Sequence, residues 1–389
     1  MNLSSGHNQK TKFVVLHPSQ KPPFLKITHT DIYRYSIPMK PFAIATGTMH
    51  YAQNVFIRVY TDEGIYGAGE CSAFPYITGE TQDTCLTMAR DFAALWKAKD
   101  PLDIPARLEE LDAFAAGNYT IKSAFDMALY DIAAKAANVP LYQFLGSTKR
   151  PVETDITIGI GPAEEMVEKA KQFEKQGAHI LKVKIGKNAY EDVEKINYIR
   201  HAVSPGMKIR VDANQGWEYE DAVFALQALD QFDIEFCEQP MRTWYDDYLP
   251  ELCHNAAVPV MADESCYNSH DARRLIKAKA CDSINIKLAK SGGIAEALKI
   301  HNLAEEAGIP CMIGGMLESR FAVTANLHFA WANPNIQFYD LDTCLLGHLE
   351  DPVTGGATYN KFILDCSDSP GIGADVDDAF LAKCDYWKV

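Results

Sequence analysis

The pattern of hydrophobic and polar positions changes partway along the chain. From about residue 24 to 75 hydrophobic residues alternate as in β-strands, and helical patterns follow from about 81 to 137. Strands followed by helices predict an α+β unit. From about residue 152 onward, a short apolar strand, a polar loop and an amphipathic helix repeat. In one repeat Met166, Ala170 and Phe173 form the apolar stripe of a helix, and Gly177 is expected to end it.

Polar residues recur near the ends of the successive predicted strands, 24 to 28 residues apart. Eight strand ends at so regular an interval predict a (β/α)8-type barrel, an α/β fold in which the carboxyl ends of all strands surround one mouth. Catalytic groups lie at that mouth in such barrels. The eight positions are Thr157, Lys184, Asp212, Glu238, Asp263, Lys287, a position near Ile313, and Asp340.

The strand HILKVKIG, residues 179 to 186, contains two lysines one residue apart. Side chains of a strand alternate between its two faces, so Lys182 and Lys184 share one face while the apolar residues between and around them share the other. The alternation repeats in DSINIKLAK and in FYDLDT, where Asp340 and Asp342 share a face. The apolar sets are expected to pack on the outer helices, and the polar sets to point into the barrel.

Composition narrows the classes of partner. The chain has 389 residues, and its 37 basic and 52 acidic residues give a net charge of −15, which disfavours nucleic acid and anionic membranes as partners. We find no apolar run near the roughly 20 residues that span a bilayer, and the apolar FVVL near the N-terminus is too short for a signal peptide. Ten cysteines without a CxxC motif indicate reduced thiols and a cytoplasmic location. The pattern leaves a homo-oligomer open.

Three consecutive strand ends carry carboxylates, Asp212 in VDANQGW, Glu238 in CEQP and Asp263 in ADES. Three acidic side chains at one mouth repel each other unless a cation holds them. Ligands that offer only oxygen favour a hard divalent ion, and we expect one Mg²⁺ per subunit. Helix capping by each residue separately would leave their adjacency unexplained.

Lysines flank these carboxylates, Lys184 on the strand before them and Lys287 on the strand after them. A lysine becomes a useful base when its pKa falls toward neutrality, and Lys182 and the metal are expected to lower the pKa of Lys184. Two lysines across the mouth suit removal of a proton from one face of a carbon and its return to the other. The metal is expected to bind the substrate carboxylate and stabilise the enediolate.

The ordered motifs KVK, VDAN, EQP, ADES and NIKLAKSGG resemble the muconate-lactonizing branch of the enolase superfamily, over roughly residues 24 to 389. The resemblance implies a (β/α)7β barrel with an N-terminal α+β capping domain. We therefore expect a polar tail at 1–23, a capping domain at 24–150 that is completed by about 350–389, and the barrel at 151–349. The segments FPYITGET, CMIGGMLES and DLD at 340–342 resemble dipeptide epimerases such as L-Ala-D/L-Glu epimerase, which implies a dipeptide substrate and a role in recycling murein peptides.

Site roles follow from the resemblance residue by residue. It implies metal ligation by the three carboxylates and acid/base roles for Lys184 and Lys287. Further substrate contacts are implied for Lys182, Thr157, Asp340, Asp342, Met316 and Gly47. Asp340 and Asp342 would hold the α-ammonium of the dipeptide, a role that charge supports because paired inward carboxylates need a cation.

The loop FAIATGTMHYAQ departs from the family pattern. Gly47 stands where Ala-Glu epimerases often place an arginine for the acidic side chain of the substrate. Either Lys40, His50 or another residue supplies the cation, or the second residue of the substrate is not acidic.

Other activities stay open at this point. A muconate cycloisomerase, an o-succinylbenzoate synthase or an N-acylamino acid racemase would use the same lysines and metal, but none needs an acidic pair for an ammonium group. A Schiff-base aldolase would use a barrel lysine without three convergent carboxylates. A non-catalytic barrel would need neither the carboxylates nor the lysines.

Overall fold

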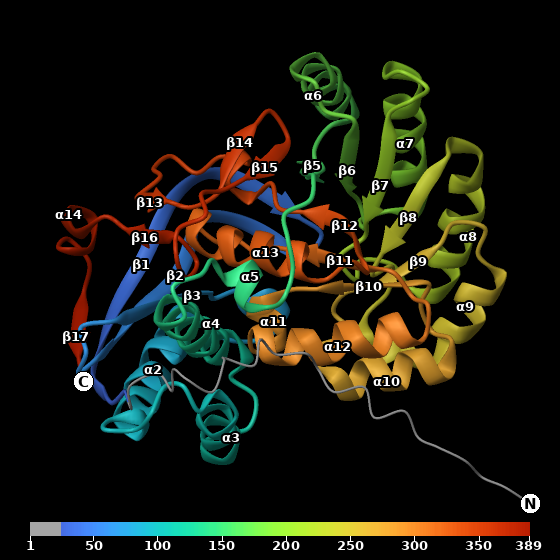
Figure 1. Ribbon diagram of the computed structural model, residues 1–389. Coiled ribbons are helices and arrows are strands. Elements are labelled where there is room, and N and C mark those ends of the chain that lie inside the picture. Colours follow the sequence, from blue (N-terminus) through green and yellow to red (C-terminus); the bar gives the residue numbers. More distant parts are fainter. Residues whose placement is uncertain (1–24) are drawn as a thin grey trace, which may run out of the picture.

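The computed structural model describes residues 25–389, so the polar tail expected at 1–23 lies outside the described residues. Figure 1 shows two parts, a layer of strands and helices from the first part of the chain and a barrel from the middle of the chain. This arrangement confirms the expected fold class, an α/β barrel joined to an N-terminal α+β unit.

The N-terminal part is built on an antiparallel sheet with the strand order β17-β1-β2-β3, and helices α2 and α4 contact this sheet. The long β1 and β2 form a hairpin whose turn lies at residues 45–46. The elements of this part are β1 (Ile27–Ile44), β2 (Gly47–Thr61), β3 (Tyr66–Ser72), α1 (Pro75–Thr78), α2 (Gln82–Trp96), α3 (Ile104–Phe114), α4 (Tyr119–Ala136) and α5 (Leu141–Phe144).

The barrel has eight parallel strands in the order in which they follow each other along the chain, from β5 to β12. A backbone hydrogen bond of 3.2 Å from Asp155 N to Tyr339 O joins its first and last strands. The strands are β5 (Ile156–Ile158), β6 (Ile180–Lys184), β7 (Lys208–Asp212), β8 (Ile234–Glu238), β9 (Val260–Ala262), β10 (Ser283–Ile286), β11 (Cys311–Gly314) and β12 (Ile336–Asp340).

Helices connect successive strands and cover the outside of the barrel. In α6 Met166 and Ala170 are buried, Phe173 is half-buried, and Gly177 ends the helix with a left-handed backbone (φ 95°), as the sequence predicts. The connecting elements are α6 (Ala163–Gln176), α7 (Ala189–Ala202), α8 (Tyr219–Leu229), η1 (Asp230–Phe232), η2 (Thr243–Tyr248), α9 (Leu249–Asn255), α10 (Ser269–Ala278), α11 (Leu288–Ser291), α12 (Ile294–Glu306) and α13 (Arg320–Ala332).

After the barrel the chain returns to the N-terminal part. The last strand, β17, pairs antiparallel with β1, with Asp31 opposite Lys388, and β15 pairs with β4, next to the start of the barrel. The remaining elements are β4 (Val152–Glu153), η3 (Thr343–Leu345), β13 (Val353–Gly355), β14 (Thr358–Asn360), β15 (Ile363–Asp365), β16 (Ala374–Val376), α14 (Asp378–Leu381) and β17 (Tyr386–Lys388).

Two buried carboxylates from the N-terminal part bind the first turns of barrel helices. Glu70 of β3 accepts hydrogen bonds from Ser319 N (2.8 Å) and Ala322 N (3.1 Å) at the start of α13. Asp126 of α4 accepts from Ile294 N (2.5 Å) and Ala295 N (3.2 Å) at the start of α12. Carboxylates satisfy the free N–H groups of a helix start and its positive dipole end, so these contacts fix how the two parts are joined.

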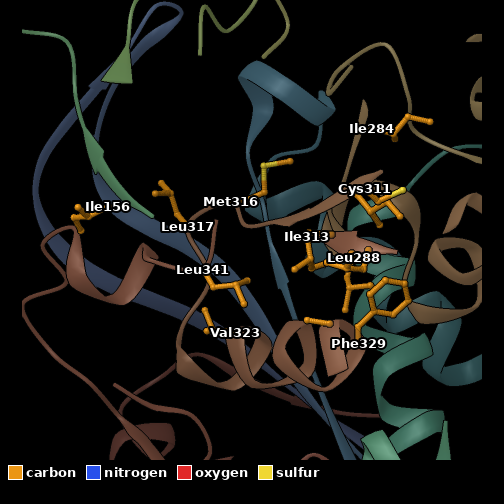
Figure 2. Packing of buried hydrophobic residues seen from close by; sticks show 14 of the residues in the cluster. Ile156, Ile284, Leu288, Cys311, Ile313, Met316, Leu317, Val323, Phe329 and Leu341 are labelled. Carbon is orange, nitrogen blue, oxygen red and sulfur yellow. The ribbon is translucent and has the colours of Figure 1, made fainter. Parts of the chain in front are cut away.

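One large apolar cluster lies between the strands of the barrel and its helices. Figure 2 shows part of it, with Ile284 and Ile313 from the barrel strands and Phe329 from α13. Ile284 and Ile286 are fully buried, which agrees with the predicted outward direction of the apolar residues of that strand. Packing on the outer helices therefore leaves the polar set of each strand inside the barrel.

All ten cysteines lie in the described part of the chain, and each is a free thiol. Among residues 25–389, none of the helices has both the length and the apolar character needed to cross a bilayer.

Candidate active site

The structure brings the sequence-predicted polar residues together at the carboxyl ends of the barrel strands. Lys182 and Lys184 lie on β6, Asp212 ends β7 and Glu238 ends β8. Asp263 follows β9, Lys287 follows β10 and Asp340 ends β12. Neighbouring strands place Lys184 directly beside Asp212, and Asp212 directly beside Glu238.

Lys182 lies at the centre of this group and is completely buried. Its Nζ is 2.6 Å from Glu238 Oε2, 2.7 Å from Asp340 Oδ2 and 3.1 Å from Asp212 Oδ2. One ammonium group therefore links carboxylates from three different strands across the inside of the barrel. This agrees with the sequence argument that Lys182 points inward, and the compensating charge comes from carboxylates.

The two lysines expected to act on the substrate each pair with a different carboxylate. Lys184 Nζ is 2.6 Å from Asp212 Oδ2, and Lys287 Nζ is 2.7 Å from Asp263 Oδ2. In the order of the eight strands, β6 and β10 are separated by four positions. Lys184 and Lys287 therefore stand on opposite sides of the mouth.

Neighbouring carboxylates raise the pKa values of Lys287 and Lys182. Burial disfavours the ammonium form of Lys287, but Asp263 and Glu238 outweigh burial and raise the pKa of Lys287 above its ordinary value. For Lys182, burial is likewise outweighed, chiefly by Asp340, and its pKa is raised. A base that works near neutrality needs the opposite direction. The same carboxylates offer oxygen ligands to a divalent cation, and the charge of such a cation near these lysines would favour their neutral form.

The donor atoms of the predicted metal ligands suit a hard divalent ion, although the acidic oxygens that the described residues bring within 4.8 Å of one another are those of Asp155, Asp340 and Asp342. Asp212, Glu238 and Asp263 are all completely buried, come from three consecutive strands and offer only oxygen atoms. Glu238 Oε2 accepts no hydrogen bond of good geometry, although Lys182 Nζ is only 2.6 Å away. These carboxylates would hold a Mg²⁺ ion, which supplies positive charge where negative charge develops on the substrate carboxylate.

A second group of carboxylates gathers on the β12 side of the mouth. Asp155, Asp340 and Asp342 are buried, and one oxygen atom of each lies within 4.8 Å of the others. Thr157 N donates a 2.6 Å hydrogen bond to Asp342 Oδ2. Burial and the neighbouring Asp340 raise the pKa of Asp342 to about 7, whereas Lys182 outweighs burial at Asp340 and lowers its pKa to about 2.

Sequence reasoning missed three buried polar residues at this site. Asp155 stands two residues before Thr157, so strand alternation could have placed it on the same inward face. Lys290 is buried in α11, with its Nζ 2.7 Å from Asp263 Oδ1, and only the helical geometry after β10 brings it there. Glu264 follows Asp263, and neither of its carboxylate oxygens has a hydrogen-bond partner. Burial, reinforced by Asp263, raises the pKa of Glu264 to about 8.

Loops of the N-terminal part contact the loops that follow the barrel strands. Ala43 O accepts a 3.1 Å hydrogen bond from Ile160 N, after β5. The Tyr267 hydroxyl, after β9, donates to Ile77 O. The β1–β2 hairpin and the segment around α1 therefore cover part of the mouth.

Gly47 lies at the start of β2, next to the ring of Tyr76. A Cβ atom at Gly47 would be 3.0 Å from Tyr76 Cζ, so a larger side chain there would require the ring to move. Lys40 and His50, the alternative cations considered from the sequence, have exposed side chains. Met316 is buried at the end of β11, where its N–H donates to Glu318 Oε2.

Comparison with known proteins agrees with this architecture. Residues 27–146 match the mandelate racemase/muconate lactonizing enzyme N-terminal domain, and residues 165–380 match the enolase C-terminal domain-like family. The chain therefore belongs to the mandelate racemase/muconate lactonizing enzyme family of the enolase superfamily.

Individual relatives cover nearly the whole chain. A D-Ala-D/L-Ala epimerase of Cytophaga hutchinsonii is 42% identical over 359 residues, 92% of this chain and 97% of the relative. An L-Ala-D/L-Glu epimerase of Clostridium acetobutylicum is 38% identical over 344 residues, 87% of this chain and 96% of the relative. The crystal structure of a dipeptide epimerase from Cytophaga hutchinsonii with Mg and D-Ala-L-Val has a TM-score of 0.92 at 40% identity, covering 94% of this chain and 100% of that one.

Proposed function

We propose that this protein is a Mg²⁺-dependent dipeptide epimerase, an isomerase that inverts the α-carbon of the C-terminal residue of a dipeptide. The observation that carries the proposal is the position of charged residues on two crossing axes of the mouth. Lys184 on β6 and Lys287 after β10 define one axis, and Glu238 on β8 and Asp340 on β12 define the other. Strands four positions apart in an eight-stranded barrel lie opposite each other, so the two axes cross.

The crossing axes suit one bound dipeptide. Its carboxylate would face the strands that carry Asp212, Glu238 and Asp263, and its α-ammonium would face Asp340 and Asp342 on the other side. The α-carbon of the C-terminal residue would then lie between Lys184 and Lys287. One lysine Nζ accepts the α-proton, and the opposite lysine Nζ returns a proton to the other face, which inverts the carbon.

Several features support an uncharged C-terminal residue in the substrate over glutamate. Gly47 offers no side chain to an acidic group, and the hairpin around it carries Phe42, Ile44 and Met49. Lys290, a cation buried near the lysine bases, is already held by Asp263. The relative with 42% identity is named for Ala-Ala epimerisation. We therefore rank Ala-Ala and Ala-Val type dipeptides above Ala-Glu.

The site favours this reaction over the alternatives. A muconate cycloisomerase, an o-succinylbenzoate synthase or an N-acylamino acid racemase has no use for Asp340 and Asp342 as an ammonium site. A Schiff-base aldolase has no use for the three carboxylates Asp212, Glu238 and Asp263. The biological setting we propose is the recycling of cell-wall dipeptides in the cytoplasm, supported by the family resemblance and by ten free cysteines.

Proton NMR in D₂O tests the proposal. The enzyme with Mg²⁺ is incubated with Ala-Ala, Ala-Val, Ala-Glu and the N-acetyl derivatives of alanine and valine. We expect loss of the α-proton signal of the C-terminal residue only, with the diastereomer appearing, and the fastest exchange for the uncharged dipeptides. Exchange of N-acetyl amino acids without exchange of any dipeptide would refute the proposal in favour of a racemase.

A further inference from the structure

Asp155 is a buried carboxylate to which neither the metal site nor the proton transfer gives a role. It stands directly before β5, and its side chain is completely buried inside the barrel. Asp155 Oδ2 accepts a 2.9 Å hydrogen bond from Arg210 Nη1, whereas Asp155 Oδ1 has no partner. A buried carboxylate oxygen without a donor is costly, so its presence calls for a physical reason.

Arg210, the cation bound to Asp155, is itself held by several other groups. Arg210 Nε is also held by Glu235 Oε2 at 2.6 Å, so the guanidinium charge is shared between two carboxylates. The rings of Phe236 and Phe338 lie 5.3 and 5.2 Å from the guanidinium carbon. Arg210 is thus fixed in place and supplies only part of the charge needed by Asp155.

The other carboxylates of the group also share their cation. Asp340 is paired with Lys182, but the same Nζ serves Asp212 and Glu238. Asp342 receives the backbone N–H of Thr157. Together, Asp155, Asp340 and Asp342 hold more carboxylate oxygens than the shared cations can neutralise, which is why the pKa values of Asp155 and Asp342 are raised. A primary ammonium group carries one positive charge and three N–H donors, which suits a pocket of carboxylate oxygens.

We propose that Asp155 is a positioning residue for the substrate ammonium group. Asp155 is completely buried, Asp342 is nearly so and Asp340 is 7% exposed, so Asp155 acts from below through the other two. One oxygen atom of Asp155 lies within 4.8 Å of oxygen atoms of Asp340 and Asp342. Burial and the neighbouring Asp340 raise the pKa of Asp155 well above its ordinary value, and a bound ammonium group favours the ionised form, which adds a third negative charge to the pocket. Asp155 thereby selects dipeptides with a free α-ammonium group over ligands that lack one. This inference rests on the proposed function and deepens it.

The test compares two ligands in the full-length enzyme with Mg²⁺. The first is Ala-Ala, and the second is propionyl-alanine, which has the same shape without the ammonium group. In Asp155→Asn we expect KM for Ala-Ala to rise about 10-fold or more with kcat changed much less. The inhibition constant of propionyl-alanine should stay within about 2-fold of the wild-type value, because this ligand brings no ammonium group for Asp155 to interact with.

Glu235→Gln is the matched control. It removes the other carboxylate partner of Arg210 but leaves Asp155, Asp340 and Asp342 in place. A merely structural role through Arg210 would make both variants lose affinity for both ligands alike, and that result would overturn the proposal. Equal KM for Ala-Ala in Asp155→Asn and wild type would also overturn it. If Asp155→Asn does not fold, the double variant Asp155→Asn/Arg210→Gln, which removes the ion pair as a unit, is measured in its place.

Metal titration distinguishes an ammonium site from a second metal site. Titration with Mn²⁺ should give one ion per chain in wild type and in Asp155→Asn. Two ions in wild type and one in the variant would make the group a second metal site and overturn the ammonium assignment. Failure of the wild-type enzyme to epimerise any dipeptide is a different result, because it refutes the proposed function before the variants are compared.

Discussion

Buried carboxylates occur in two regions of this molecule, and their partners differ. Where the N-terminal part meets the barrel, Glu70 and Asp126 accept hydrogen bonds from backbone N–H groups at helix starts. At the barrel mouth Asp212 and Asp263 are bound mainly by the ammonium groups of lysines. All four carboxylates are completely buried, so the difference lies in their donors and not in burial.

The difference teaches which region can accept a ligand. A backbone N–H cannot leave its carboxylate without unfolding the first turn of a helix, so the carboxylates of the interface are static. A lysine side chain has four rotatable bonds and can move its ammonium group, so a metal or substrate can replace it as the partner. At the mouth, Asp155 Oδ1 and both carboxylate oxygens of Glu264 accept no hydrogen bond. The interface carboxylates Glu70 and Asp126 have no such unpartnered oxygen.

Removing either of the two lysines that we propose as bases should reduce activity most severely. In Lys184→Ala and Lys287→Ala we expect epimerisation to fall by about 10³-fold or more, because a positioned acid or base contributes roughly 10²–10⁴. The measurement is the rate of diastereomer formation in D₂O. The exposed Lys299→Ala serves as the control and should keep full activity. Full activity in either lysine variant would contradict the two-base mechanism.

Replacing a carboxylate that we assign to the metal should have the next largest effect. Asp263→Asn removes a charged oxygen ligand and leaves Lys287 and Lys290 without their ion pair. Saturating Mg²⁺ should stabilise wild type by about 2.7 kcal/mol at 100 times Kd, seen as a rise in Tm over an EDTA-treated sample. That rise should be absent or much smaller in Asp263→Asn. An unchanged rise would show that the ion binds elsewhere.

Removing one carboxylate of the pair that we assign to the substrate ammonium group, Asp340 and Asp342, should have a more selective effect. Asp342→Asn keeps the size of the side chain but loses one charge, so we expect kcat/KM for Ala-Ala to fall about 10-fold or more. N-acetyl-alanine has no ammonium group, and the rate of its α-proton exchange should change far less. Equal losses for both compounds would mean that Asp342 does not recognise the ammonium group.

Much of the barrel and its charged mouth could be predicted from the sequence. Strand alternation alone placed Lys182 inside the barrel, and the structure confirms it as completely buried. The near-constant spacing of strand ends located the mouth because each strand and helix pair has nearly the same length. The same alternation would place Asp155 on the inward face with Thr157, but the spacing of strand ends uses only one residue from each strand.

Other features depend on tertiary contacts that no local pattern encodes. Lys290 reaches Asp263 because a short helix follows β10 directly. Glu70 and Asp126 sit in sequences typical of a strand and a helix, and their partners are 249 and 168 residues away. Tyr76 lies against Gly47 only after the hairpin and the segment around α1 come together. Long-range pairs of this kind determine both how the two parts are joined and how the hairpin packs against the segment around α1.

The last predicted effect is on stability and leaves the reaction untouched: it concerns the interface and its dependence on pH. Burial, opposed by the Ile294 and Ala295 amides, raises the pKa of Asp126 to about 7 in the folded protein, against roughly 3.9 in an unfolded chain. The folded state therefore binds the proton of Asp126 more tightly. The stability that this provides is complete below about pH 4 and is lost as the pH rises through about 7.

The Asp126→Asn variant has no carboxyl group to ionise at this position, so its stability should not show this fall as the pH rises. The free energy of unfolding of the variant should improve relative to wild type by roughly 2–3 kcal/mol between pH 5 and pH 8, measured by urea unfolding at each pH. The exposed Asp91→Asn is the control and should follow wild type in parallel. A difference between Asp126→Asn and wild type that does not change with pH would mean that Asp126 is already ionised at pH 5. The two backbone N–H donors at the start of α12 would then be enough to hold a buried charge. The interface would in that case carry ionised carboxylates, as the mouth does, although it has backbone donors in place of lysines.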